Sequence, residues 1–143
     1  MNRDLEQAKK LLLEDSLAFI VINNGQIIGT SVGKGVVDLL ALVESQAAKL
    51  TGASLADKLV GKAVAAMVCH VGIKAVYTPV ISRAALEMLR QHNIRPEYDE
   101  LVPMILSRDG VMRGPLEQLL LEINDPAQAV AVVSDFLKNR SAN

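Results

Sequence analysis

Two runs of β-forming residues joined by asparagines and a glycine constrain the fold more than any other part of this chain. The runs occupy 17–22 and 26–30, and Asn23, Asn24 and Gly25 lie between them. Asparagine and glycine tolerate the positive φ angles that tight hairpin turns require. We therefore expect an antiparallel β-hairpin. A helix over 4–14 should precede it, because apolar residues recur there at helical spacing.

Helices and single strands are expected to alternate after the hairpin. The spacing of apolar residues and the positions of glycine and proline predict helices over 36–50, 54–71, 82–92, 115–123 and 126–138. Strands are predicted over 74–78 and over 98–106, the second interrupted at Pro103, and a turn over 108–110. Asp125 should cap the last helix, with Pro126 in its first turn. This order predicts one α/β domain over 1–143, layered α-β-α, with a mixed sheet that begins with the hairpin and carries helices on both faces.

Composition excludes several classes of protein. The formal net charge is −1 and no long basic run occurs, so the pattern of a nucleic-acid-binding protein is absent. A single cysteine rules out an internal disulfide framework. The N-terminus lacks the basic start and apolar run of a signal peptide, and no apolar stretch approaches the ~20 residues that cross a membrane. A cytoplasmic protein is expected, without nucleic-acid or membrane partners.

The apolar content of the chain favours self-association. Half of the residues are hydrophobic, yet only 3% are aromatic and none is tryptophan. A small core built from Leu, Val, Ile and Ala leaves apolar surface exposed. This composition therefore favours a homo-oligomer that buries one face.

Ser54 and Asp57 stand three residues apart at the start of the helix predicted over 54–71. This spacing matches a capping box, in which each side chain bonds a backbone N–H of the other residue. A second interpretation uses the same geometry, because a helix N-terminus also attracts anions. Lys58 and Lys62 are four residues apart and would lie on one side of that helix, where they could hold a phosphate or carboxylate. Both interpretations stay open.

A second candidate position is the end of the strand at Thr78, followed by the helix predicted from Ser82. Ligands of open α/β sheets bind beyond strand ends, although Ser82 could equally be a plain N-cap. We therefore predict a site for a nucleotide or related phosphorylated small molecule, built from Ser54, Asp57, Lys58, Lys62, Thr78, Ser82 and Arg83. The alternative is an interaction or oligomerisation module in which these polar residues serve structure alone.

Several of these segments resemble a known family. Residues 52–58 read Gly-Ala-Ser-Leu-Ala-Asp-Lys, 61–63 read Gly-Lys-Ala, and 101–103 read Leu-Val-Pro, with Pro115 and Glu117 further on. Together with the hairpin, they resemble a small bacterial and archaeal domain-of-unknown-function family whose members adopt a cytidine-deaminase-like fold. The resemblance covers nearly the whole chain. It implies that fold and does not imply a reaction.

The zinc motifs of the deaminase superfamily are missing. Those enzymes carry a His or Cys followed two residues later by Glu at one helix start, and Pro-Cys-x-x-Cys at the next. The corresponding segments here read Ala-Ser-Leu-Ala-Asp over 53–57 and Pro-Val-Ile-Ser-Arg over 79–83. We therefore expect no zinc, no other cofactor and no zinc-dependent deamination. The sequence leaves open whether the chain is another kind of enzyme.

Overall fold

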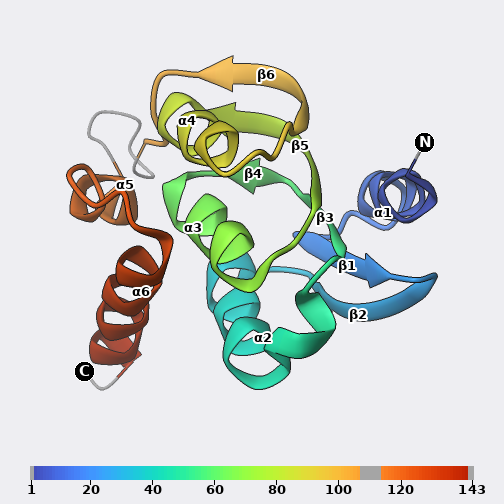
Figure 1. The fold of residues 1–143 in the computed structure, drawn as a ribbon, viewed down its shortest axis with the longest axis horizontal. Coiled ribbons are helices and arrows are strands. Elements are labelled where there is room, and N and C mark those ends of the chain that lie inside the picture. The colour runs from blue at the N-terminus through green and yellow to red at the C-terminus, as the bar shows by residue number, and fades with distance from the viewer. Residues whose placement is uncertain (1, 107–113, 142–143) are drawn as a thin grey trace.

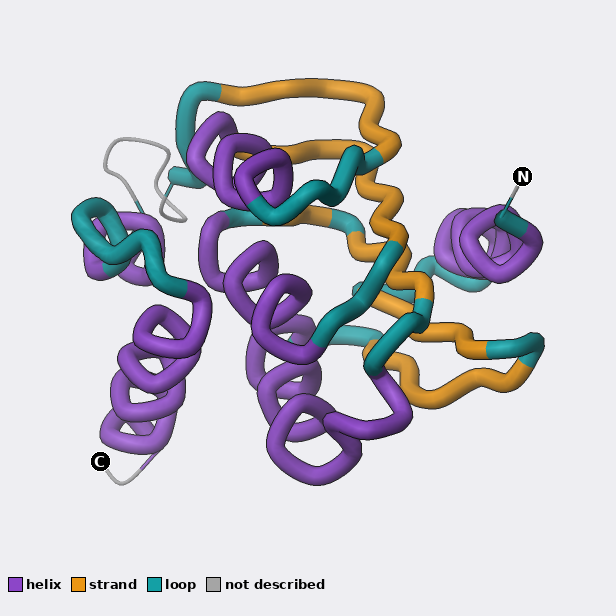
Figure 2. Tube along the Cα trace, viewed as in Figure 1, coloured by secondary structure: helices purple, strands orange, loops and turns teal. Residues whose placement is uncertain are grey.

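A mixed sheet of six strands runs through the computed structural model, which describes residues 2–106 and 114–141 (Figures 1 and 2). The strands are β1 (Phe19–Asn23), β2 (Gln26–Ser31), β3 (Ser54–Asp57), β4 (Leu59–Val60), β5 (Ala75–Ser82) and β6 (Glu97–Val102). β1 pairs antiparallel with β2 and β3, whereas β5 pairs parallel with β3, β4 and β6. β3 and β4 follow each other along one side of β5, and β6 lies along the other side.

Helices cover both faces of this sheet (Figure 1). α1 (Arg3–Glu14) packs on one face, in a core cluster with β1, β3 and β5. The opposite face carries α2 (Gly35–Leu50), α3 (Lys62–Val71) and α4 (Arg83–Gln91). α5 (Pro115–Leu119) and α6 (Pro126–Ser141) lie on that same side, beyond α3. The layered α-β-α fold with a mixed sheet is therefore confirmed.

The two cores follow from the alternation of side chains along β1. Phe19 and Val21 point into the larger core with α2 and α3, while Ile20 and Ile22 point toward α1. Successive residues of a strand face opposite sides of the sheet, so a run of apolar residues can fill two cores. None of the described helices is both long and apolar enough to cross a bilayer.

The predicted hairpin is present. Asn24 and Gly25 have φ angles of 51° and 80°, the left-handed values that a two-residue turn requires. The Asp4 side chain accepts hydrogen bonds from both of their backbone N–H groups, at 2.8 and 3.0 Å. Asn2 caps α1 by accepting from the Leu5 N–H at 2.9 Å. The turn is therefore joined directly to the first helix.

The helix predicted over 54–71 is wrong in its first half. Residues 54–57 form β3, which pairs with β1 on one side and β5 on the other, and α3 begins only at Lys62. Every residue of β3 is buried. A strand buried on both faces lacks the alternation that reveals strands, and Leu55 and Ala56 favour helix in isolation.

Other element boundaries differ from the predicted ones by fewer residues. β5 continues through Pro79 to Ser82 rather than ending at Thr78, and β6 stops at Val102, just before Pro103. α5 is shorter than predicted, whereas α6 extends past Lys138. The Asp125 cap is confirmed, since its carboxylate accepts from the Gln128 N–H at 2.9 Å. The turn predicted over 108–110 lies outside the described residues.

Candidate functional site

The carboxylate of Glu117 lies at the N-termini of two helices. Its Oε1 atom accepts a hydrogen bond from the Lys62 backbone N–H at 3.0 Å, at the start of α3. The same oxygen accepts from the Ser82 hydroxyl at 3.2 Å, at the start of α4, while Ser82 caps that helix through the Ala85 N–H. Only 6% of Glu117 is exposed. A buried carboxylate here compensates the partial positive charge at both helix starts.

Gly61 makes this arrangement possible. A Cβ atom at position 61 would lie 2.7 Å from Glu117 Oε1 and 3.1 Å from Ile105 Cγ1. The first distance is shorter than any ordinary contact, and the carboxylate cannot move without leaving the helix starts. The close approach of Glu117 to α3 therefore requires glycine at the N-cap position.

The Lys62 side chain turns away from these helix starts. Its ammonium group donates to the Leu120 carbonyl at 2.7 Å, to Asn124 Oδ1 at 3.0 Å and more weakly to the Leu121 carbonyl at 3.4 Å. Burial lowers the pKa of the Lys62 ammonium, and the charge of Glu117 opposes that shift. All three N–H groups of the ammonium have acceptors. The Lys62 side chain therefore connects the start of α3 to the end of α5 through hydrogen bonds.

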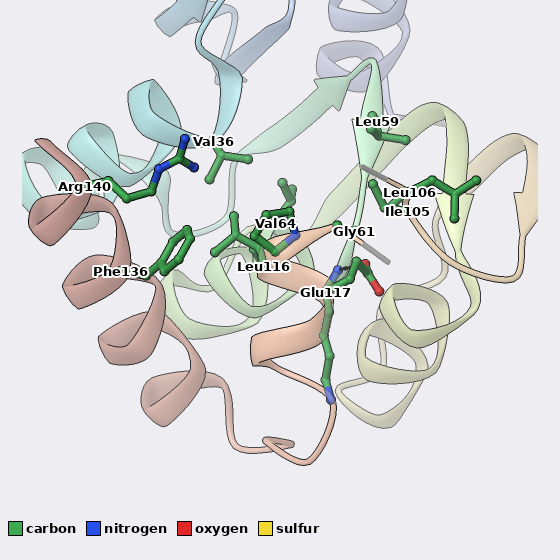
Figure 3. Close-up of a pocket in the computed structure, with 14 residues that line it drawn as sticks. Val36, Leu59, Gly61, Val64, Ile105, Leu106, Leu116, Glu117, Phe136 and Arg140 are labelled. Carbon is green, nitrogen blue, oxygen red and sulfur yellow. Dashed lines mark hydrogen bonds between the residues drawn. The ribbon is translucent and has the colours of Figure 1, made fainter. Parts of the chain in front are cut away.

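A pocket of about 210 Å³ opens beside Glu117 (Figure 3). Its walls come from the starts of α2 and α3, from β4, from α5 and α6, and from the segment after β6. Most of the lining side chains are apolar: Val36, Leu59, Ala63, Val64, Ile105, Leu106, Leu116 and Phe136. Lys62, Glu117 and Arg140 add charged groups, and Figure 3 shows Arg140 beside Phe136 and away from Glu117.

Two polar groups of the pocket, Glu117 Oε2 and the Arg140 guanidinium, have no hydrogen-bond or ion-pair partner among the residues that the structure describes. Glu117 Oε2 makes no hydrogen bond to the described residues, and every buried side-chain nitrogen or oxygen in that part of the chain has a partner. Oε2 is therefore within reach of solvent. The Arg140 guanidinium lies 5.5 Å from the centroid of the Phe136 ring and forms no ion pair with residues 2–106 or 114–140. The site offers one hydrogen-bond acceptor and one cation across an apolar hollow.

Comparison with known proteins identifies the family. Residues 7–137 match the model of a family described as a domain of unknown function, DUF1893 (TM1506). The chain belongs to the DUF1893 family. The resemblance to a family of unknown function is thereby confirmed. Among curated proteins, none matches the sequence.

One solved structure agrees with this assignment, and a second is reported beside it. A crystal structure of a DUF1893 family protein (TM1506) from Thermotoga maritima is 28% identical, covers 94% of this chain and 91% of its own, and has a TM-score of 0.83. A tRNA:A34 deaminase, studied for A-to-I editing at the wobble position of transfer RNA, is 13% identical. That match covers 88% of this chain and 94% of the other, with a TM-score of 0.44.

In this DUF1893 chain, Ser54 and Asp57 do not form the predicted capping box, because both lie in β3. The Ser54 hydroxyl donates to Asn2 Oδ1 at 3.3 Å, and Asp57 Oδ1 accepts from the Leu59 N–H at 3.2 Å. Burial raises the pKa of the Asp57 carboxyl to about 7, and the bond from Leu59 opposes that shift only in part. Both side chains are enclosed within the fold.

Lys58 and Lys62 do not share one side of a helix. Lys58 is exposed in the link between β3 and β4, whereas Lys62 is buried at the start of α3. The paired-lysine anion site that the sequence predicted is therefore not formed. The prediction assumed a continuous helix over 54–71, but residues 54–57 and 59–60 form strands and α3 begins only at Lys62.

Thr78, Ser82 and Arg83 have three different environments. The Thr78 hydroxyl is buried and bonds both the N–H and the carbonyl of Val80, at 3.2 and 2.8 Å. Ser82 is the N-cap of α4, as predicted, and also contacts Glu117. Arg83 is exposed and lines a separate hollow with Glu87. Of the predicted residues, only Lys62 and Ser82 meet at Glu117.

The donor groups at the helix starts do not fit a zinc ion. Within the described residues, no group of three His, Cys, Asp or Glu side chains is placed to hold a metal. Ser82 and Glu117 are already engaged with backbone and with each other, and neither a thiolate nor an imidazole lines the described pocket. Zinc sites in proteins are built mainly from such sulfur and nitrogen ligands.

Proposed function

We propose that the chain binds a nucleotide or a related phosphorylated small molecule in the pocket beside Glu117. The observation that carries this proposal is the placement of Glu117 Oε2 and Arg140 on an otherwise apolar hollow. Small-molecule sites commonly combine apolar walls with a few polar groups that set orientation. The proposal concerns binding and specifies no reaction.

The interior of the pocket suits a planar group that carries hydrogen-bond donors. Aliphatic side chains of Val36, Val64 and Leu116 supply flat apolar contact. Glu117 Oε2 accepts hydrogen bonds, and bonds to an ionised carboxylate are stronger than neutral ones. The amino and ring N–H groups of a nucleobase match this acceptor, whereas a carboxylate or phosphate would be repelled from it.

The anionic end of such a ligand belongs at Arg140. The helix starts that attract anions in other proteins already bind the Glu117 carboxylate here, so a phosphate has no free N-terminus to occupy at α3. A guanidinium binds phosphate with two parallel hydrogen bonds. The base would therefore lie against Glu117, and the phosphate would lie at the rim of the pocket near Arg140. A site at a helix N-terminus would instead place the phosphate at the helix start.

Binding of adenosine and cytidine 5′-monophosphates, measured by isothermal titration calorimetry beside the two nucleosides, tests the proposal. We expect saturable binding, with the nucleosides weaker by roughly tenfold because they lose the pairing with Arg140. Arg140→Gln should reduce the affinity of the bound monophosphate to that of its nucleoside. Arg3→Gln, which changes an exposed arginine on α1, should leave it unchanged.

A steric pair of variants locates the ligand. Val36→Phe places a larger side chain in the pocket and should abolish binding, whereas Val37→Phe alters the neighbouring residue, which is 46% exposed and outside the pocket. Failure of all four compounds to bind would contradict the proposal. So would a Val36→Phe protein that binds as well as the wild type, or a loss of binding in Lys58→Gln instead of Arg140→Gln.

Self-association is a second candidate function, favoured by apolar side chains exposed around the pocket mouth. Leu59 and Leu106 line the pocket and are 42% and 49% exposed, and Val37 is exposed on the adjoining turn of α2. Exposed apolar patches of this kind commonly mark interfaces. The expected occupant is a second copy of the chain, covering the mouth of the pocket.

Sedimentation velocity over a range of protein concentrations tests this candidate. We expect a dimer, which Leu59→Glu should weaken by about tenfold or more because a charge would enter an apolar interface. Leu13→Glu is the matched control, since Leu13 is similarly exposed on α1, across the sheet. A monomer at all concentrations, or equal weakening by both variants, would contradict the interface.

A further inference from the structure

Two arginines that form no ion pair with any residue the structure describes line a hollow between the end of α4 and the start of β6. The hollow has a volume of about 760 Å³ and is lined by Leu86, Arg90, Asn93, Arg95, Pro96 and Tyr98. α4 and β6 are adjacent in Figure 1, where β6 lies at the edge of the sheet and α4 on the face opposite α1. None of these lining residues belongs to the pocket beside Glu117.

Two of the three acidic residues of β6, Glu97 and Asp99, are directed away from this hollow. Successive side chains of β6 point to opposite faces of the sheet. Glu97 pairs in register with Tyr77, whose ring packs in the core cluster beneath α1. On that side Glu97 binds Lys9 at 2.6 Å, and Asp99 accepts from the Tyr77 hydroxyl at 2.7 Å. Tyr98 faces the opposite side and packs against the larger core. Glu97 and Asp99 are therefore separated from the arginines by the strand, and Glu100, two residues beyond Tyr98, does not line the hollow.

Neither arginine has an ion pair or a side-chain hydrogen bond within the described residues. Arg90 lies in the last turn of α4, where a cation compensates the helix dipole. Arg95 lies beyond the helix, so the dipole does not account for it. Two guanidinium groups around one hollow repel each other unless an anion lies between them.

We propose that this hollow binds a phosphate ester that carries an aromatic ring. Arg90 and Arg95 would bind the phosphate oxygens through their paired N–H groups. Tyr98, which is half-buried, would contact the ring of the ligand, and the apolar surfaces of Leu86 and Pro96 would complete the hollow. This site is independent of the pocket beside Glu117 and of the ligand proposed there.

The probe is phenyl phosphate, and its binding to the full chain is measured by ¹H–¹⁵N NMR titration. Inorganic phosphate and phenol, which each carry one of its two parts, are titrated for comparison. We expect saturable shifts of the amide signals over 86–98 with phenyl phosphate, weaker binding of phosphate by roughly tenfold, and none with phenol. Arg90→Gln/Arg95→Gln should weaken phenyl phosphate by roughly tenfold or more. Tyr98→Leu should reduce its affinity to that of inorganic phosphate.

A matched double variant controls for net charge. Arg3→Gln/Lys10→Gln removes two exposed cations from α1 and should leave the affinity within about twofold. Wild-type protein without saturable shifts would overturn the proposal, as would a double arginine variant that binds normally. Shifts confined to residues around Glu117 would also overturn it, and would place the probe in the other pocket.

Discussion

Replacing Glu117 with alanine should lower the free energy of unfolding by about 2–4 kcal/mol. The substitution leaves the Lys62 N–H and the Ser82 hydroxyl buried without their acceptor, and it removes a negative charge from the starts of α3 and α4. Lost capping and unsatisfied buried donors are among the few mechanisms that give single substitutions large effects.

Urea unfolding followed by circular dichroism measures this loss. Glu117→Gln keeps an oxygen acceptor but no charge, so we expect about half of the effect. Glu100→Ala, which changes an exposed glutamate of β6, should lie within about 0.5 kcal/mol of the wild type. Equal stabilities for Glu117→Ala and Glu100→Ala would show that the carboxylate does not hold the helix starts together.

Stability should fall as the pH rises from about 4 to about 7, owing to Asp57. The pKa of this carboxyl is raised from 3.8 to about 7 in the folded chain by burial. Between these values the folded state binds a proton that the unfolded state has released, so each increase in pH favours unfolding. The whole shift corresponds to at most about 4 kcal/mol, and above pH 7 the contribution of this group is constant.

Asp57→Asn isolates that effect. Asparagine retains an acceptor for the Leu59 N–H and cannot ionise, so the variant should match the wild type near pH 4 and exceed its stability at pH 8. Urea unfolding at several pH values gives the difference in the free energy of unfolding between the two proteins. The contributions of other titrating groups are the same in both proteins and cancel in this difference. Asp15→Asn, on an exposed carboxyl, should follow the wild-type curve. Parallel curves for wild type and Asp57→Asn would refute the assignment.

Features set by neighbouring residues could be predicted from the sequence. The hairpin follows from Asn24 and Gly25, which both adopt positive φ in its turn, and the start of α4 follows from the capping geometry of Ser82. β3 could not be predicted in this way. Ser54 and Asp57 resemble a capping box as long as their partners in β1 and β5 are unknown, and those pairings lie far away in sequence.

The candidate site was only partly predictable for the same reason. Glu117 is 55 residues from Lys62 and 35 from Ser82, and in sequence it is an ordinary acid in the first turn of a short helix. Gly61 is a weak indication of the site, because a glycine just before a buried helix often marks a place where another group approaches the backbone closely. Nothing local to position 61 indicates that the approaching group is a carboxylate from α5.

The order in which the chain is synthesised gives Glu117 a further consequence. α3 and α4 leave the ribosome before residue 117 does, so both helix starts emerge without the carboxylate that binds them. Domains generally fold as units as they are synthesised, and incomplete ones expose surface that aggregates. A nascent chain arrested before residue 117 should therefore remain open to proteases at α3 and α4, and a short extension that includes α5 should close both helices together.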